Sequence, residues 1–407
     1  MAPDIAKGAF CWWGVLAIWV GGGLLSLCGA LGYAELATTY PREGGDYVYL
    51  SRAYGRWAGF LFGWIQLTIV RPGDIALMAF AFATYARTIY DPLMNTVLPS
   101  GERLYACTAV VVLTMINILG VREGKWTQNL LTTVKALGLM GIVVVAAIAP
   151  KGAASTGSFE PLPASLALIF VLFTYGGWNE MAYVAAEVKN PRRNIVRALV
   201  VGTTAVMVLY LLVNGAFLYA LGYNGLACSK AVAADSIATI FPRIGGRLIS
   251  ALVCISALGA VNGLIFTGAR ISYAVGAEHR PLRILGRWHK RTETPVWALA
   301  VQGVIAAGLI VALGSFIKTI IYTAAAVYSF YLATSLAVVI LRYKEPQVER
   351  PYRVTGYPLT TIIFCGVCAF LIYSSVSYAL TNQRISLFIS LGVFLTGGLV
   401  YLYSRYG

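Results

Sequence analysis

The chain has 407 residues, of which 59% are hydrophobic and only 12% are charged, and its mean hydropathy is +0.75. These values exclude a soluble globular protein, and apolar segments recur along the whole chain. The net charge of +15 does not indicate nucleic-acid binding, because the basic residues occupy short loops between apolar segments. The sequence therefore predicts a polytopic membrane protein that is surrounded by lipid and has no nucleic-acid partner.

The apolar segments are long enough to cross a bilayer, which takes about 20 residues in a helix. Eleven segments qualify, and they predict an all-α fold in one membrane domain, residues 1–407. They cover residues 12–37, 57–87, 104–120, 128–149, 163–186, 196–221, 246–275, 295–314, 317–341, 357–380 and 385–404. An odd number of spans places the two termini on opposite sides of the membrane.

Lysine and arginine are unequally divided between the alternate loops that join these spans. One set of loops contains most of them, including Arg42, Arg122, Arg192, Arg283 and Arg350. Because basic loops stay in the cytoplasm, we expect a multi-pass protein of the cell inner membrane with its C-terminus inside and its N-terminus outside. The opening residues, MAPDIAKGAFC, lack the basic and apolar regions of a signal peptide.

Three basic residues lie inside predicted spans, where ionisable groups are costly and usually functional. Lys135 has apolar sequence on both sides, and a functional role is favoured over extension of its side chain to the cytoplasmic surface. Arg270 lies near the end of its span, where that extension is the better explanation. Arg71 belongs to the sequence RPGD (71–74), which predicts a kink with a structural Arg–Asp pair.

The predicted span at 163–186 is interrupted in its middle. Gly176 and Gly177 lower helix propensity there, and the polar Asn179 and Glu180 follow. Irregular backbone survives in a membrane only where protein or a wet cavity covers it, so such a break indicates a transporter's binding site. The alternative is that Asn179 and Glu180 hydrogen-bond to neighbouring helices. A cavity-lining role is favoured, with half-helix ends that hold the carboxylate and ammonium of an amino acid.

Signatures of catalysis or of metal binding are not found in the sequence. The seven cysteines are scattered and are interpreted as buried thiols, and the C-x-x-C pair Cys365 and Cys368 has no second pair or nearby histidine. Both histidines, His279 and His289, lie in a charged loop. G-x-S-x-G, H-E-x-x-H and the phosphate-binding G-x-x-x-x-G-K-[ST] are missing. The sequence therefore predicts no catalytic residues, no metal, no cofactor, and neither an enzyme nor a primary pump.

Several motifs in a fixed order carry a family resemblance. They are Gly32–Ala37 (GYAELA), Val70–Gly73 (VRPG), Tyr175–Asn179 (YGGWN), Ser256–Tyr273 (SALGAVNGLIFTGARISY) and Glu349–Pro358 (ERPYRVTGYP). With these motifs the chain resembles the amino acid–polyamine–organocation (APC) superfamily of permeases, and most closely its L-type amino acid transporter branch, as a bacterial relative.

The resemblance implies the LeuT-type fold, in which five helices repeat with inverted topology and two more follow. Residues 1–149 are then the remainder of the first repeat, residues 163–341 the second repeat, and residues 357–405 the two C-terminal helices. It also implies a secondary active transporter that moves amino acids by alternating access, through exchange (antiport) or proton-coupled uptake.

The family's site residues carry over to matching positions. By motif, Phe173 is the aromatic gate over the substrate, Gly176 and Gly177 offer unwound backbone, and Trp178 and Asn179 support that turn. Lys135 matches a lysine whose ammonium replaces the ion of sodium-coupled relatives, and Ser256 is expected near it. This match implies a sodium-independent transporter.

The chain departs from the family pattern in two side chains. Glu180 replaces an aromatic or amide residue, and it is assigned either to substrate preference or to proton coupling. The loop between Thr88 and Arg103 has no cysteine where animal light chains bond to a glycoprotein, so no disulfide-linked heavy chain is expected.

The third departure is the number of spans, because the family has twelve helices and this chain shows eleven. The first helix normally carries a GSGIF-like break that supplies the other half of the site. We expect Met1 to be an internal methionine and about 35–45 upstream codons to encode the missing helix. The alternative functions are a transport-fold nutrient sensor or a non-transporting truncated homologue.

Overall fold

The computed structural model describes residues 1–42, 44–91, 101–120, 158–182, 188–238, 245–289 and 292–406, together with Thr133, Leu137, Gly138, Met140, Gly141, Val143, Val144 and Ala185. Within these ranges the chain is helical, and its β-structure is limited to an isolated bridge between His289 and Thr294. The all-α prediction is confirmed.

Nine helices in the described ranges are long and apolar enough to cross a membrane. They are α2 (Trp12–Thr39), a continuous helix of α4 (Arg56–Ile65), the π-helix η1 (Gln66–Val70) and α5 (Arg71–Ile89), α6 (Gly101–Ile118), α9 (Pro191–Cys228), α11 (Gly245–Glu278), α12 (Val296–Leu313), α13 (Phe316–Lys344), α14 (Leu359–Asn382) and α15 (Arg384–Tyr406). They match nine of the eleven predicted spans. The predicted span 128–149 lies largely outside the described residues, and the span 163–186 is broken after α8 (Ala164–Thr174).

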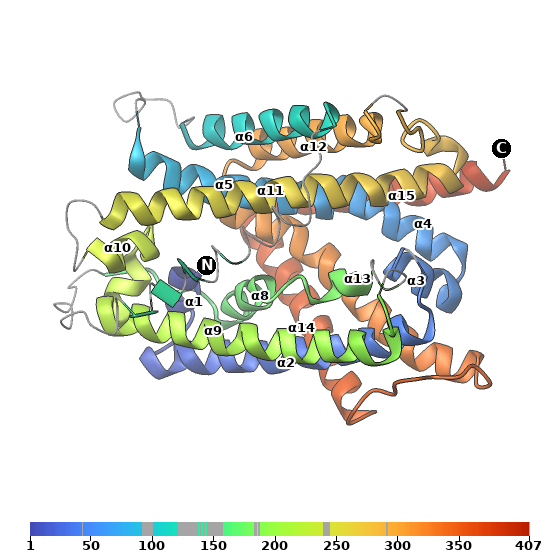
Figure 1. Ribbon diagram of the computed structural model, residues 1–407, viewed down its shortest axis with the longest axis horizontal. Helices are drawn as coiled ribbons and strands as arrows, with labels where there is room; N and C mark the ends of the chain where they lie inside the picture. Colours follow the sequence, from blue (N-terminus) through green and yellow to red (C-terminus); the bar gives the residue numbers. More distant parts are fainter. Residues whose placement is uncertain are drawn as a thin grey trace.

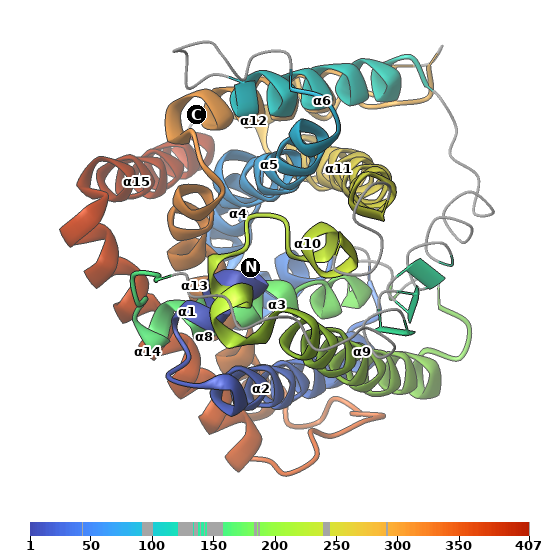
Figure 2. The same cartoon turned by 90° about the vertical axis from the view of Figure 1, so that its left-hand side faces the viewer.

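The helices form two layers, with their long axes roughly parallel (Figure 1). The upper layer in this view contains α4–α5, α6, α11 and α12, and the lower layer contains α2 and α9 with α8 and the 3-10 helix η2 (Trp178–Ala182) packed against α2. The view from the end shows the same separation (Figure 2). Helix α13 and the short α10 (Val232–Ala238) contact members of both layers.

Small residues let α2 approach the broken segment closely. A Cβ atom on Gly22 would lie 2.7 Å from Val171 of α8, and one on Gly29 would lie 2.9 Å from the Trp178 ring of η2. Without a hydrophobic driving force between helices in lipid, this kind of close backbone packing supplies much of the association energy. Helices α2 and α8 and the segment η2 are thereby held together as one packed unit.

The distortion in the second span lies just before Arg71. Residues Gln66–Val70 form a π-helix, in which the Arg71 amide donates to the Gln66 carbonyl five residues back. Pro72 follows at the second position of α5 and has no amide hydrogen to donate. The widened turn accommodates the proline, so the span continues to Ile89 and the predicted kink takes the form of a π-bulge.

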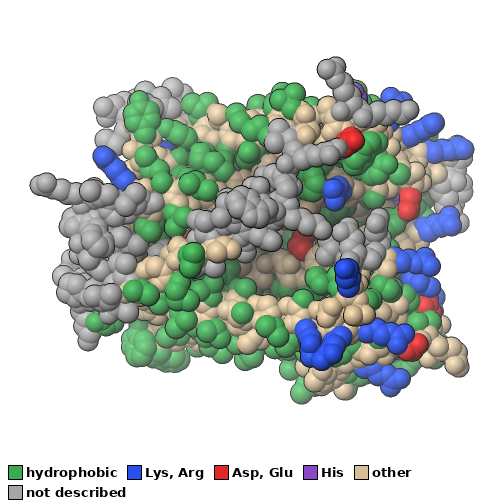
Figure 3. Space-filling model, viewed as in Figure 1, with side chains coloured by type: hydrophobic (Ala, Val, Ile, Leu, Met, Phe, Trp, Pro, Cys, Tyr) green, Lys and Arg blue, Asp and Glu red, His purple; other side chains and the backbone are tan. Residues whose placement is uncertain are grey.

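Basic side chains gather at the end of the molecule where α15 ends (Figures 1 and 3). Glu35, near the end of α2, is buried there at 3% exposure of its side chain and lies between two arginines. Arg342 donates to it from Nε at 2.8 Å and from Nη2, and Arg350 Nε lies 3.6 Å away. The Val354 amide donates to the same carboxylate at 2.7 Å. Glu35 therefore ties α2 to the end of α13 and to the link into α14 (residues 345–358).

A second polar cluster at the same end joins α3 (Asp46–Tyr54) to the last residue of α11 and to His279, which follows it. The Tyr47 hydroxyl donates to Glu278, and it lies 3.3 Å from Nε2 of His279. Burial and the Glu278 carboxylate raise the pKa of Tyr47. Burial lowers the pKa of His279, the positive charge of Arg56 lowers it further, and Glu278 opposes both.

Candidate functional site: a broken membrane helix

The helix break lies where the sequence predicted it. Helix α8 ends at Thr174, the Gly176 amide donates to Phe173 O at 3.0 Å, and Gly177 takes a φ of +102°. The chain becomes helical again at Trp178, where the 3-10 helix η2 begins. Gly177 adopts a conformation that other residues rarely tolerate, because they carry a Cβ atom. The prediction of an interrupted helix at Gly176–Gly177 is confirmed.

Tyrosine hydroxyls cover backbone carbonyls before and beside the break. Tyr210 of α9 donates to Thr174 O at 3.0 Å, and Tyr328 of α13 donates to Ile169 O at 3.1 Å. Tyr175 donates in turn to Trp19 O of α2 at 3.0 Å. Backbone groups at membrane depth need such partners, so three neighbouring elements support the irregular segment.

Aromatic rings enclose the first residue after the break. The Trp178 ring lies edge-on to Tyr33 of α2 at 5.0 Å between centroids, and it also meets Tyr331 at 5.1 Å and Phe364 at 5.9 Å. Only 9% of Trp178 is exposed. These contacts pack Trp178 against α2, α13 and α14, and its role at the substrate site stays a prediction.

The predicted gate residue and the predicted amide both contact tyrosines of α13. The half-buried Phe173 packs edge-on against Tyr328, with centroids 6.1 Å apart. The Oδ1 atom of the buried Asn179 accepts from the Tyr331 hydroxyl at 3.3 Å. Gly176 and Gly177 are exposed between these two anchored residues.

A salt bridge joins the break to the upper layer. Nη2 of Arg71, at the start of α5, lies 2.7 Å from Oε1 of Glu180 in η2. The Arg71 side chain is 3% exposed and that of Glu180 is 40% exposed. Asp74, one turn further along α5, interacts electrostatically with both of them. The sequence RPGD predicted Asp74 as the partner of Arg71, but this prediction describes only part of the arrangement. The salt bridge of Arg71 is formed with Glu180, which comes from a distant part of the chain.

The surface between the two layers is recessed near the middle of the long axis, and acidic side-chain atoms are visible in this recess (Figure 3). Arg71 compensates the charge of Glu180, so this carboxylate is not an unpaired anion in the structure. The cluster of Arg71, Glu180 and Asp74 instead presents paired charges next to exposed backbone. Paired charges beside free backbone dipoles suit a zwitterionic ligand.

The remaining predicted residues are not part of this cluster in the described ranges. Lys135 lies outside the described residues. Ser256 is half-buried on α11, which packs against α5, and its predicted proximity to Lys135 stays a prediction. Arg270 is exposed, with its guanidinium 4.2 Å above the ring of Phe266, one turn earlier in α11, and its predicted extension toward the cytoplasmic surface stays a prediction.

Tyr328 and Tyr331, which contact the predicted site residues Phe173 and Asn179, were not predicted from the sequence. Tyr328 and Tyr331 belong to the apolar span α13, and nothing in their local sequence distinguishes them from ordinary interfacial aromatics. A weak signal exists in their spacing, because residues three apart share one helix face. The contacts with Phe173 and Asn179 depend on tertiary packing.

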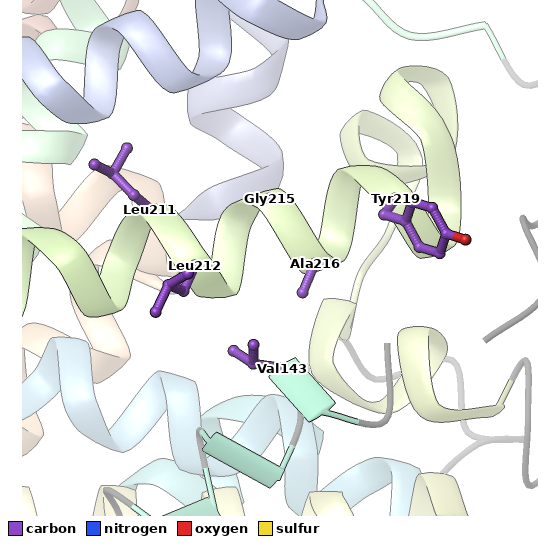
Figure 4. A pocket seen from close by; sticks show the side chains of 6 residues that line it. All are labelled: Val143, Leu211, Leu212, Gly215, Ala216 and Tyr219. Atoms are coloured by element: carbon purple, nitrogen blue, oxygen red, sulfur yellow. The ribbon is translucent and has the colours of Figure 1, made fainter. Parts of the chain in front are cut away.

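Two apolar grooves lie elsewhere. One, of about 420 Å³, follows α9 and is lined by Val143, Leu211, Leu212, Gly215, Ala216 and Tyr219 (Figure 4). The other, of about 450 Å³, is lined by Phe82, Leu104, Tyr105, Thr108, Ala109, Val112, Leu113 and Leu258. Neither lining contains a charged side chain, so neither matches the two charges of an amino acid. In the described ranges no group of three or more His, Cys, Asp or Glu is arranged to hold a metal ion.

Comparison with known proteins agrees with this geometry. The family model described as amino acid permease matches residues 6–400. The human protein "large neutral amino acids transporter small subunit 2" is 32% identical, over 96% of this chain and 74% of its own length. The rabbit (Oryctolagus cuniculus) "b(0,+)-type amino acid transporter 1" is 31% identical, over 83% of this chain and 71% of its own length.

These matches extend over nearly the whole chain and include both layers and the break. The chain is therefore an amino acid transporter with the polytopic LeuT-type helical fold, and it belongs to the amino acid permease family of the APC superfamily.

Proposed function

We propose that this protein is a sodium-independent secondary transporter of amino acids with neutral side chains, working by alternating access in the cell inner membrane. The observation that carries the proposal is the broken helix, whose exposed Gly176 and Gly177 lie between an aromatic gate residue and an interlayer salt bridge. We also propose that its C-terminus is cytoplasmic and that it works without a disulfide-linked heavy chain.

The broken segment supplies two kinds of partner for the substrate. The start of η2 offers amide groups to the carboxylate, and the end of α8 offers carbonyls to the ammonium. Phe173 closes over the substrate from the end of α8. We assign residues 1–149 to the remainder of the first inverted repeat, residues 163–341 to the second repeat and residues 357–405 to two additional helices.

A neutral substrate is supported by two observations. Glu180 is paired with Arg71, so its charge does not select for a cationic side chain. One of the relatives is named for large neutral amino acids. Exchange and proton-coupled uptake both remain compatible with this site.

Sodium independence follows from the proposed role of Lys135. In this proposal the Lys135 ammonium replaces the coupling cation and Ser256 contributes to the same site, and Lys135 itself lies outside the described residues. Uptake by the Lys135→Gln variant is expected to be lost with and without sodium, because the variant lacks the cation and gains no sodium ligands. Sodium-dependent uptake by the unchanged protein would contradict this assignment.

Uptake into proteoliposomes tests the proposal. Labelled neutral, cationic and acidic amino acids are supplied with or without internal amino acid, in sodium or potassium buffer, and with or without a pH gradient. We expect neutral substrates to enter equally well in both salts. Stimulation by internal substrate identifies exchange, and stimulation by an inward proton gradient identifies symport.

Two results would count against transport. Absence of uptake for all three classes contradicts the proposed function. Binding of an amino acid without flux, measured as a substrate-dependent rise in thermal stability, supports the alternative of a nutrient sensor.

A further inference from the structure

The Arg71–Glu180 salt bridge joins the two helix layers. Arg71 starts α5 in the upper layer, and Glu180 lies in η2 of the lower layer. The bond is 2.7 Å long and Arg71 is 3% exposed. Any motion that separates α5 from the broken helix must therefore break this contact.

Breaking this contact removes the counter-charge of the buried Arg71 guanidinium, which opposes the motion, and also removes the partner of the partly exposed Glu180 carboxylate. The motion becomes accessible when each charge has a second partner. For Arg71 that partner is Asp74, three residues along the same helix, because residues at this spacing share one face. Asp74 already interacts electrostatically with Arg71.

Glu180 has no such substitute on its own short helix, whose other residues are Trp178, Asn179, Met181 and Ala182. Its side chain is 40% exposed, in contrast to the buried Arg71, so a ligand can approach the carboxylate. The ammonium group of an amino acid is a suitable replacement, because ammonium and carboxylate form strong charge-assisted hydrogen bonds.

We propose that the Arg71–Glu180 salt bridge is a latch that holds the empty transporter closed, and that the ammonium of the substrate opens it by replacing Arg71 on Glu180 while Arg71 turns to Asp74. The proposal rests on the transport function proposed above. It has a direct consequence for coupling. The empty protein relatches and does not return across the membrane, so flux proceeds as exchange.

The test measures two fluxes in the same proteoliposomes: efflux of labelled neutral amino acid into empty buffer, and efflux into buffer containing the same amino acid. The ratio of the first to the second is low for a latched exchanger. Arg71→Gln is expected to raise this ratio about tenfold, which corresponds to about 1.4 kcal/mol of latch free energy. Arg71→Lys keeps the charge and should keep the ratio near that of the unchanged protein.

Two further variants separate the latch from a general effect of charge removal. Asp74→Asn removes the second partner of Arg71, so it should slow both fluxes without raising the ratio. Arg87→Gln is the matched control, because Arg87, in the last turn of α5, forms a 2.7 Å salt bridge with Asp91, four residues further along the chain, and this bridge does not join the two layers. It should leave the ratio unchanged.

An unchanged ratio in Arg71→Gln would overturn the proposal, provided that gel filtration shows a folded protein. If that variant does not fold, Glu180→Gln removes the same bond from the other side and must raise the ratio instead. Flux that is driven by a proton gradient and independent of external amino acid also refutes the latch, because a proton then replaces the substrate on Glu180. Complete absence of flux in the unchanged protein contradicts the transport function itself.

Discussion

The buried carboxylate of Glu35 offers a sharp test of how the basic end of the fold is stabilised. Changing Glu35 to Gln removes a negative charge and keeps the shape and one carbonyl acceptor for the Val354 amide. Arg342 and Arg350, with side chains 20% and 8% exposed, then lose the carboxylate that both contact. The variant should be less stable because two largely buried guanidinium groups lose their compensating charge.

The expected loss can be bounded from the burial of the pair. Removing one partner of a buried salt bridge costs about 3–5 kcal/mol. The lower limit applies here, because Arg342 retains some solvent contact and lies 3.8 Å above the Tyr357 ring. We therefore expect Glu35→Gln to lower the free energy of unfolding by about 3 kcal/mol.

The measurement is reversible unfolding in mixed micelles of mild detergent and sodium dodecyl sulfate, followed by tryptophan fluorescence. Glu349→Gln is the control, since Glu349 pairs with Arg192 at 3.1 Å and both side chains are mostly exposed, at 73% and 66%. An exposed pair contributes about 0–1 kcal/mol. Equal losses in the two variants would refute the argument that burial sets the cost.

Three other changes test packing, backbone conformation and pH dependence. Gly73→Ala should destabilise the fold, because its Cβ would lie 2.1 Å from Cγ2 of Thr323, and adding Thr323→Ser should recover part of the loss. Gly177→Ala should reduce the free energy of unfolding by about 1–2 kcal/mol, since the φ of Gly177 is +102°. Gly202→Ala is the control for the Gly73 and Gly177 variants, because the space around its Cβ position is open, and it should be neutral or stabilising. Burial lowers the pKa of His279, so below about pH 6.5 the unfolded chain binds more protons and stability falls as pH drops. His279→Gln should flatten that part of the stability–pH curve, and an unchanged slope would exclude His279 as its source.

The spans and the break were predictable because each depends on local composition. A run of apolar residues sets the length of a membrane helix, and two adjacent glycines followed by Asn179 and Glu180 are incompatible with a continuous one. The predicted span 196–221 ends just before Gly222, where non-helical backbone (φ 69°, ψ 174°) interrupts α9, but it begins five residues after the helix start at Pro191, because polar residues precede the apolar run. For α11, the predicted span 246–275 differs from Gly245–Glu278 by one residue at the start and three at the end.

The partners of the site residues were not predictable in the same way. Glu180 and Arg71 are 109 positions apart in the chain, and the sequence around Arg71 offered Asp74 as a nearer partner. Tyr331 and Trp178 meet only because α13 crosses the broken helix. Such contacts depend on the packing of layers, which residue patterns within one helix do not specify.

The π-helix before Arg71 has a consequence for the register of the whole second span. A π-turn holds one residue more than an α-turn, so it rotates everything after it by about 100° relative to a regular helix. Deleting one residue from Gln66–Val70 would restore α-helical winding and carry the guanidinium of Arg71 round to a different face of the helix. The direction in which the Arg71 side chain points is thus set by the one extra residue in the π-turn. A shift of the helical register by one residue would redirect this charge even though Arg71, Asp74 and Glu180 all remained in the sequence.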